Sequence, residues 1–342
     1  MPYAASREAF SEFEPERPTR DGPRAGLPAL TVKPGTEITR DRLPSTGAVP
    51  PGLTGRIEAP PPPAADPYAA APREVPPQKT PQKTPQTAAQ TAVLAVVPPA
   101  AVVAPAGEPL WKRNAARIAL QPGLPRIGVV IDDLGLDRKR TERAMRLPAP
   151  VTLAFLPYGR RLGDETARAR KSGHEILVHV PMEPEGKGAD PGPNALLTGS
   201  GTAELRVRLD WALSRFDGYV GINNHMGSKF TSDPKAMDLI AAELKARGLL
   251  FLDSRTAKSA VAFDRARAAG VPAAVRQVFL DRDPARKAID AELKRLEDLA
   301  RRHGSAIAIG HPHDKTLDAL DAWLPTLAAK GLQLAPVSAL VE

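Results

Sequence analysis

The sequence predicts an α/β protein: a deformed (β/α) barrel of seven or eight parallel strands, preceded by a disordered Pro/Ala-rich N-terminal region. Short apolar runs alternate with longer amphipathic runs from residue 126 onward, which is the pattern of a parallel sheet covered by helices. The 217 residues from 126 to 342 suffice for a substantial core. By contrast, 25 of the 38 prolines precede residue 126.

Proline composition also sets the expected domain boundary. The front third contains APPPPAADPYAAAP (59–72) and PQKTPQKTPQT (77–87), and proline removes backbone donors and favours extended chain. We therefore expect a disordered linker over 1–120 and a barrel domain over 121–342. The only candidate membrane segment, 91–107, is interrupted by prolines and falls short of the roughly 20 apolar residues that a span needs. No membrane span is predicted, and the polar first 22 residues show no signal peptide.

The barrel prediction depends on a series of strands separated by helices. The stretches 203–216 and 234–248 have helical spacing, and Gly248 is expected to stop the second helix. Seven or eight such units favour a closed barrel over an open sheet. The candidate strands are 126–132, 151–157, 175–181, 219–224, 248–253, 275–281, 305–311 and a weaker 332–337.

Charge and cysteine content exclude several classes of function. The formal net charge is +8, but basic and acidic residues alternate along helices such as 137–146, as on solvated faces. No basic stripe studded with aromatic residues appears, so nucleic acid is not an expected partner. The chain has no cysteine, so any metal must be held by histidine, aspartate or glutamate.

Polar residues gather where the predicted strands end, and four of the six histidines are among them. The carboxyl ends of the strands are where a parallel barrel places its working groups. Each residue alone also has a structural explanation: an aspartate pair can form a polar turn, and a lone histidine is often a satisfied core residue. The strand-end groups are Asp132-Asp133, Pro157-Tyr158, His179 with Glu183, Asn223-Asn224-His225, Asp253-Ser254-Arg255, Asp281-Arg282-Asp283 and His311-Pro312-His313.

Together these groups suit a divalent metal bound by imidazole and carboxylate. Such a metal lowers the pKa of bound water and polarises a carbonyl. One aspartate of the adjacent pair can ligate the metal while the other accepts a proton from water. A histidine from the opposite side of the barrel can then protonate a leaving amine.

Five motifs, in order and at strand ends, resemble the divergent polysaccharide deacetylase family, which is distantly related to metal-dependent polysaccharide deacetylases. They are VVIDDLG, GHEILVHVPME, INNHMGS, FLDSRT and IAIGHPHDKTLDAL. The resemblance covers about Arg126 to Glu342 and implies a deformed barrel. It also implies that Asp132 is the catalytic base, Asp133 and His179 are metal ligands, and His311 is the general acid.

Two departures from the metal-dependent relatives alter the expected ligand set. Glu183 stands where the relatives have a second histidine, and INNHMGS replaces an Arg-Pro-Tyr-type motif. We therefore expect His225 to complete the metal set, with Glu183 as a fourth ligand or as a partner that holds one imidazole in its ligating tautomer. Zinc is the first choice, although manganese, cobalt or nickel would also fit.

The resulting prediction is a metal-dependent hydrolase that removes acyl groups from a polysaccharide. The substrate class and a periplasmic or cell-envelope location come from the family resemblance. We expect substrate contacts from Asn224, Asp253, Arg255 and His313 at the same rim. The alternative is a non-catalytic module that binds a glycan or a protein on a barrel of this kind.

Overall fold

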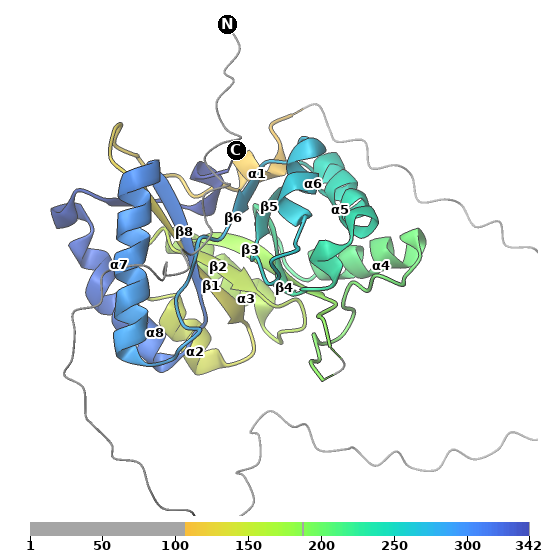
Figure 1. The fold of residues 1–342 in the computed structure, drawn as a ribbon, viewed down its shortest axis with the longest axis horizontal. Coiled ribbons are helices and arrows are strands. Elements are labelled where there is room, and N and C mark those ends of the chain that lie inside the picture. Colours follow the sequence, from red (N-terminus) through yellow and green to blue (C-terminus); the bar gives the residue numbers. More distant parts are fainter. Residues whose placement is uncertain (1–106, 187, 342) are drawn as a thin grey trace, which may run out of the picture. The chain divides into compact units, whose positions relative to one another are not determined.

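A computed structural model describes residues 107–186 and 188–341, which form a curled parallel sheet with helices on its outer side (Figure 1). The hydrogen-bonded order of the strands is β6-β5-β4-β3-β2-β1-β8-β7, and β9 pairs with β1. All of these pairs are parallel. The α/β barrel architecture predicted from the sequence is therefore confirmed. The expectation of disorder for residues 1–106 concerns residues outside those that the structure describes.

The strands occupy most of the ranges predicted for them. They are β1 Arg126–Leu134, β2 Thr152–Phe155, β3 Glu175–Met182, β4 Gly221–Met226, β5 Leu250–Asp253, β6 Ala273–Val275, β7 Val278–Phe279, β8 Ser305–Gly310 and β9 Gln333–Leu334.

Helices follow most of the strands. The α-helices are α1 Leu110–Arg113, α2 Arg138–Ala144, α3 Leu162–Lys171, α4 Thr202–Leu213, α5 Pro234–Arg247, α6 Ala262–Ala268, α7 Arg286–His303 and α8 Asp314–Trp323. Short 3-10 helices are η1 Phe230–Ser232, η2 Leu324–Thr326, η3 Ala328–Lys330 and η4 Val337–Ala339. Among the described residues, no helix is long and apolar enough to cross a membrane.

Helix α5 shows how local sequence sets these bounds. Its N-cap, Asp233, accepts hydrogen bonds from the backbone N–H groups of Lys235 and Ala236 at 2.9 and 3.2 Å, and Pro234 occupies the first turn, where its missing N–H costs nothing. The helix ends at Gly248, whose φ of 63° suits a residue without a side chain. The predicted helix over 234–248 is therefore observed, one residue shorter.

The sheet does not close by regular pairing between its two end strands, β6 and β7. Only Arg276 and Gln277 separate these strands in the chain. The backbone N–H of Arg276 donates to the carbonyl of Asp253, the last residue of β5, and that of Gln277 donates to the carbonyl of Ile307 in β8, both at 3.0 Å. The single strand predicted over 275–281 is thus two shorter strands, joined by a segment that spans the open side of the curled sheet.

Alternation along the strands separates an outer core from the barrel interior. In β1, Ile127, Val129 and Ile131 belong to the large cluster that packs against the helices, whereas Val130 belongs to a smaller inner cluster. Leu177 of β3 and several residues of β5 and β8 share that inner cluster. Residues in phase with Val130 therefore face the interior, as the two-residue period of a strand requires.

The amino-terminal end of the barrel is filled by the C-terminal segment. Val337, Leu340 and Val341 pack with the inner cluster, and a Cβ on Gly128 would approach Leu340 Cδ1 to 2.7 Å, so a side chain at this position would displace Leu340. The buried carboxylate of Glu175 accepts from the backbone N–H of residue 338 at 2.9 Å, and burial raises the pKa of Glu175. This end of the barrel is therefore closed.

Helix α1 shows that the folded domain begins earlier than residue 120. The backbone N–H of Trp111 donates to the carbonyl of Gly248 at 2.9 Å, and the Asn114 side-chain amide donates to the carbonyl of Tyr219 at 2.9 Å. Arg170 Nη1 donates to the carbonyl of Asn114 at 3.1 Å. Residues 110–114 thus already pack on the barrel, upstream of the boundary expected from proline content.

Candidate metal centre and active site

Strand β1 carries two adjacent aspartates near its end, and their side chains reach the same site. Successive residues of a regular strand point to opposite faces, so adjacent carboxylates in one site require a break in the alternation. The register of β1 against β2 shifts between Ile131 and Leu134, and Asp133 has a φ of 58°. Aspartate is one of the few residues that tolerate this left-handed conformation. Asp132 Oδ2 and Asp133 Oδ1 consequently lie 3.6 and 3.2 Å from the same atom, His179 Nε2.

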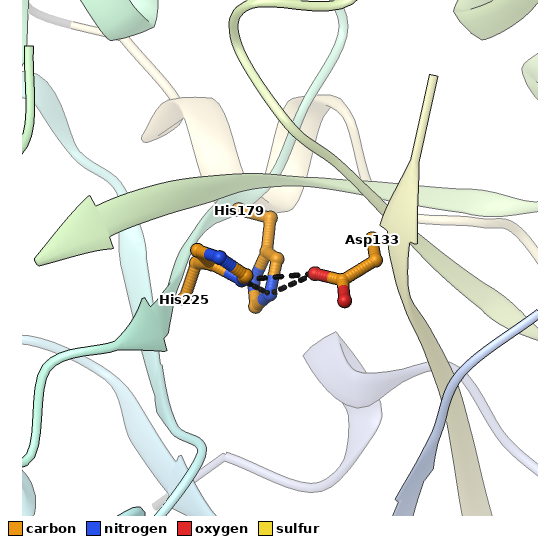
Figure 2. A group of neighbouring side chains, drawn as sticks. All are labelled: Asp133, His179 and His225. Atoms are coloured by element: carbon orange, nitrogen blue, oxygen red, sulfur yellow. Dashed lines mark hydrogen bonds and ion pairs between the residues drawn. The ribbon is translucent and has the colours of Figure 1, made fainter. Parts of the chain in front are cut away.

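Three predicted metal ligands converge in the structure (Figure 2). Asp133 Oδ1 lies 3.2 Å from His179 Nε2 and 2.9 Å from His225 Nδ1. The two ring nitrogens are 3.2 Å apart. His179 is buried in β3, and His225 stands near the end of the neighbouring strand β4. Asp133, His179 and His225 thus offer one oxygen and two nitrogens to a common point.

The geometry of this group fits a small divalent cation. Bonds of about 2.0–2.1 Å at tetrahedral angles place neighbouring ligand atoms about 3.3 Å apart, close to the three separations observed. Asp133 Oδ1 is buried and accepts no properly directed hydrogen bond in the structure, although two ring nitrogens stand beside it. A cation at the common point would give this buried carboxylate oxygen a direct ligand contact.

The charge state of the group also favours a cation. Burial alone would raise the pKa of Asp133, but His179 and His225 hold that pKa well below its usual range. Burial alone would lower the pKa of His179, whereas Asp132 and Asp133 raise it above its usual value. Two carboxylates thus make a positive charge favourable at this position, whether it is a proton or a metal ion.

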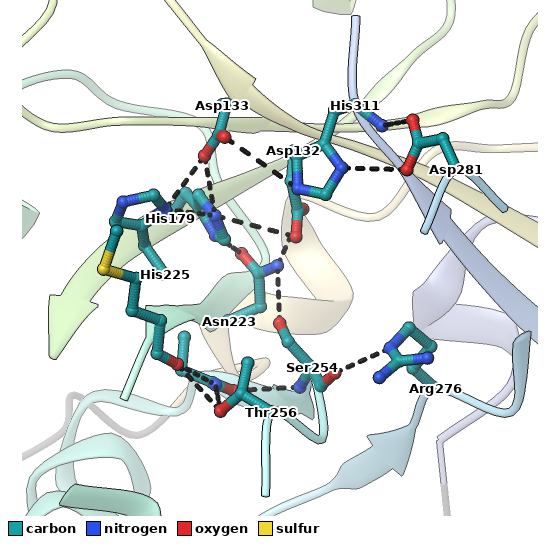
Figure 3. Close-up of polar contacts among 12 residues, drawn as sticks. Asp132, Asp133, His179, Asn223, His225, Ser254, Thr256, Arg276, Asp281 and His311 are labelled. Carbon is teal, nitrogen blue, oxygen red and sulfur yellow. Dashed lines mark hydrogen bonds and ion pairs between the residues drawn. The ribbon is translucent and has the colours of Figure 1, made fainter. Parts of the chain in front are cut away.

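Asn223 connects the proposed base to a metal ligand (Figure 3). Its Nδ2 donates to Asp132 Oδ1 at 2.8 Å and to Ser254 Oγ at 3.2 Å. Since these two contacts identify the amide nitrogen, Asn223 Oδ1 must accept from His179 Nδ1, at 3.0 Å. In its neutral form, His179 then carries its proton on Nδ1 and presents the Nε2 lone pair toward Asp133, as a metal ligand requires.

Asn223 was not among the site residues expected from the sequence, although a signal for it exists. Residues two apart in a strand point to the same face, so Asn223 lies in phase with His225, whereas Asn224 does not. Asn224, the expected substrate contact, points to the opposite face of the strand. The strand period therefore distinguishes the two neighbouring amides.

Replacement of Asn223 by Ala is expected to weaken metal affinity by about 10- to 100-fold, the usual effect of losing the partner of a ligating histidine. Isothermal titration with zinc would measure the change. The matched control is Asn194→Gly, because Asn194 is exposed with a φ of 56°, which glycine accepts. Wild-type affinity in the Asn223→Ala protein would show that the amide does not orient His179.

His311 approaches the same carboxylates from β8 (Figure 3). Its Nε2 is 3.8 Å from Asp133 Oδ2, and its Nδ1 bonds to Asp281 Oδ1 at 3.0 Å. Asp281 is fixed in turn, because its Oδ2 accepts from the His311 backbone N–H at 2.6 Å and from Thr316 Oγ1 at 2.9 Å. Burial alone would lower the pKa of His311, but Asp281 and then Asp133 and Asp132 raise it to about 9. His311 is therefore protonated at neutral pH with Nε2 directed toward the site.

Glu183 does not join the three converging ligands. Its Oε2 accepts from the backbone N–H and the hydroxyl of Thr198 at 2.7 and 2.6 Å, and its Oε1 pairs with Lys229 Nζ at 2.6 Å. Both oxygens are thus occupied by the loop between β3 and α4 and by the segment after β4. The expected role as a fourth ligand or as a histidine partner has no support in this geometry, and Glu183 instead secures the loop.

Two of the four expected substrate contacts are occupied by the protein itself. Asn224 Oδ1 accepts from the Ser254 backbone N–H at 2.9 Å, and Asn224 Nδ2 donates to the Met226 carbonyl at 2.7 Å. Asp253 Oδ1 accepts from the Arg255 backbone N–H at 2.7 Å, and the residue is only 2% exposed. Both side chains therefore stabilise the loops at the rim.

The other two expected contacts remain accessible. The side chains of Arg255 and His313 are exposed, and the rings of His313 and His311 lie with their centroids 5.9 Å apart. Asp281, His311 and His313 also form a second group of potential ligand atoms, but both Asp281 oxygens already accept hydrogen bonds. The group formed by Asp133, His179 and His225 is therefore the better metal centre.

Fold and site together define a (β/α) barrel with imidazole and carboxylate donors at the carboxyl ends of its strands. A model of the divergent polysaccharide deacetylase family matches residues 129–341, and the chain belongs to that family. It is 36% identical over 195 residues to the uncharacterized protein YibQ of Escherichia coli (strain K12), covering 57% of this chain and 61% of YibQ. The chain thus spans about three fifths of that relative.

Two further comparisons agree with this assignment. The chain is 35% identical over 204 residues to an uncharacterized protein of Haemophilus influenzae, covering 59% of this chain and 72% of the relative. The crystal structure of an uncharacterized protein from Agrobacterium tumefaciens C58 superposes with a TM-score of 0.68 at 32% identity, covering 70% of this chain and 98% of that protein. The family resemblance of the sequence motifs is therefore confirmed.

Proposed function

We propose that this protein is a metal-dependent hydrolase that removes acyl groups from a glycan. The observation that supports this best is the presence of two proton-transfer groups beside the converging ligands (Figure 3). Asp132 Oδ2 lies 3.6 Å from His179 Nε2, and His311 Nε2 lies 3.8 Å from Asp133 Oδ2. A module that only binds glycans needs neither group.

The ligand set suits zinc first, and manganese, cobalt or nickel would also fit two imidazoles and one carboxylate. Asp133, His179 and His225 would hold the ion. When bound, it would polarise the acyl carbonyl and make water a stronger nucleophile. The two proton transfers of the reaction are assigned to side chains of this protein.

Asp132 is suited to accept the proton of the attacking water. Asn223 holds Asp132 Oδ1 at 2.8 Å, which leaves Oδ2 for the proton, and burial raises the pKa of Asp132 above its usual value. A raised pKa makes the carboxylate a better base. The hydroxyl left by the water then bonds to the acyl carbon.

His311 is suited to complete the reaction as the general acid. Its Nε2 proton passes to the leaving amine nitrogen, or to the leaving oxygen of an ester, as the bond to the acyl carbon breaks. Asp281 stabilises the protonated ring before this transfer through the 3.0 Å contact with Nδ1. The products are a carboxylic acid and a glycan with a free amine or hydroxyl.

The substrate class and the location in this proposal are supported by family membership. An acylated polysaccharide of the cell envelope fits a family of divergent polysaccharide deacetylases. The exposed Arg255 and His313 side chains are available to contact such a chain at the rim.

Acetate release tests the proposal directly. Protein freed of metal and reloaded separately with zinc, manganese, cobalt or nickel is expected to release acetate from N-acetylated or O-acetylated oligosaccharides, and a chelator is expected to stop the release. The Asp132→Asn protein loaded with the same metal is the control for contaminating activity. Oligosaccharide binding without acetate release under every metal would favour the alternative, a glycan-binding module.

A further inference from the structure

Three arginines stand at the same rim as the proposed active site. Arg255 follows β5, Arg276 follows β6 directly, and Arg282 follows β7. The carboxyl ends of parallel strands share one side of a barrel, so these arginines share the side that holds Asp132 and His311. Their segments are also joined by hydrogen bonds and ring contacts.

Arg276 is held in place by backbone carbonyls. Its Nε donates to the carbonyl of Ser254 at 2.7 Å and its Nη2 to that of Arg255 at 2.8 Å. A guanidinium has five N–H donors, so three remain without an acceptor in the part of the chain that the structure describes. Ser254 Oγ also accepts from Asn223 at 3.2 Å (Figure 3), which places Arg276 close to the residues that orient the base.

Phe279 connects this cluster to the proposed acid. The guanidinium carbon of Arg276 lies 4.9 Å from the centre of the Phe279 ring, and that of Arg282 lies 5.8 Å from it. The same ring meets His311 edge to face, with centroids 5.5 Å apart. The two arginines therefore share one aromatic ring, and that ring also contacts His311.

No carboxylate forms a direct ion pair with the cluster within the described residues. Elsewhere most buried or half-buried arginines have ion pairs, as Arg143 does with Asp318, but no ion pair within 4.0 Å is formed by the side chains of Arg255, Arg276 or Arg282. Asp253 is nearby but buried, and it bonds to a backbone N–H. Burial first, and then the charge of Arg282, lowers the pKa of Arg276, and the nearby carboxylates of Asp132 and Asp253 offset this shift only in part.

We propose that Arg255, Arg276 and Arg282 form a subsite for an anionic group, a carboxylate or a phosphate, on the glycan. The inference rests on the proposed function, because it assigns the substrate class of that site. Guanidinium donors match the paired oxygens of both groups. An anion here would fill the unused donors of Arg276 and relieve the repulsion among three like charges. The acyl group would then be removed from a sugar adjacent to an acidic one.

Binding of acyl-free sugars tests this subsite without requiring turnover. The probes share one backbone: cellotriose, the same trimer oxidised to carboxylate at C6, and the trimer phosphorylated at C6. The probes are titrated into the zinc-loaded full chain at constant ionic strength. A charged probe is expected to bind at least about tenfold more tightly than neutral cellotriose. Preference for the carboxylate would identify a uronic acid, and preference for the phosphate would identify a phosphorylated sugar.

Two variants separate the subsite from general charge effects. The double variant Arg255→Gln/Arg282→Gln is expected to lose the preference, whereas Arg302→Gln/Arg286→Gln, which removes the same charge from α7, is expected to keep it. All four side chains are exposed, so folding should be preserved. Equal binding of neutral and charged probes, or a preference that survives in the first double variant, would overturn the subsite. If the protein releases acetate from neutral substrates but shows no preference for charged probes, the hydrolase proposal is supported and the subsite is wrong.

Discussion

Replacement of His179 or His225 by Ala is expected to abolish tight metal binding. Each histidine provides one of the three donor atoms, which lie 2.9–3.2 Å from one another, so its loss leaves two ligands, too few for the usual zinc site. The loss of affinity should exceed the roughly 10- to 100-fold effect of removing a partner of a ligand. Metal content after dialysis and titration with zinc would measure it, and acetate release should fall in parallel.

The control for this pair is His303→Ala. His303 is exposed at the end of α7, on the side of the barrel where β8 begins, so its removal tests adventitious binding by surface imidazole. If the His225→Ala protein binds zinc as tightly as the wild type, His225 is not a metal ligand. His225 would then be a substrate contact.

Replacement of His311 by Ala, or of Asp132 by Asn, is expected to lower turnover by about 10²- to 10⁴-fold, the range for losing a general acid or base. Metal content should remain at the wild-type level, because neither side chain belongs to the three converging ligands. Steady-state acetate release and metal analysis on the same samples would separate the two effects. Loss of metal from the His311→Ala protein would make His311 a ligand and leave the reaction without its proposed acid.

Nuclear magnetic resonance titration of the metal-free protein gives a second measurement on His311. Its pKa is expected near 9, so the ring should stay protonated up to about that pH and lose its proton as the pH rises through it. Asp281→Asn removes the carboxylate that raises this pKa, so the titration should move to lower pH. Titration of the wild-type ring near the ordinary histidine value, about 6.5, would contradict the role of Asp281.

Much of the fold could be predicted because buried parallel strands have a strong sequence signature. The run in β3 is buried throughout, and its apolar residues mark it plainly. The region 275–281 was harder, because its division into β6 and β7 depends on how the sheet closes. Local sequence does not encode that closure, because it depends on partners distant in the chain. The backbone N–H of Arg276 bonds to β5, whereas that of Gln277 bonds to β8.

The positions of the three converging ligands could be predicted from topology, since strand ends of a parallel barrel meet at one rim. The environment of Glu183 could not, because it depends on the loop after β3 folding back so that residues 182 and 196 form a bridge. That return places Thr198 against the carboxylate. The partnership of His311 with Asp281 likewise depends on the pairing of β7 with β8, which brings together residues thirty positions apart.

The point at which the described chain enters the barrel determines which way the site faces. Helix α1 packs near Gly248, beside the start of β5, and the last described residues fill the same end of the barrel. Both ends of the described domain therefore lie on the side of the barrel opposite the rim with Asp132 and His311. Coupling the protein to a support through surface lysines such as Lys229, near the rim, should consequently obstruct the access of long polymers to the site.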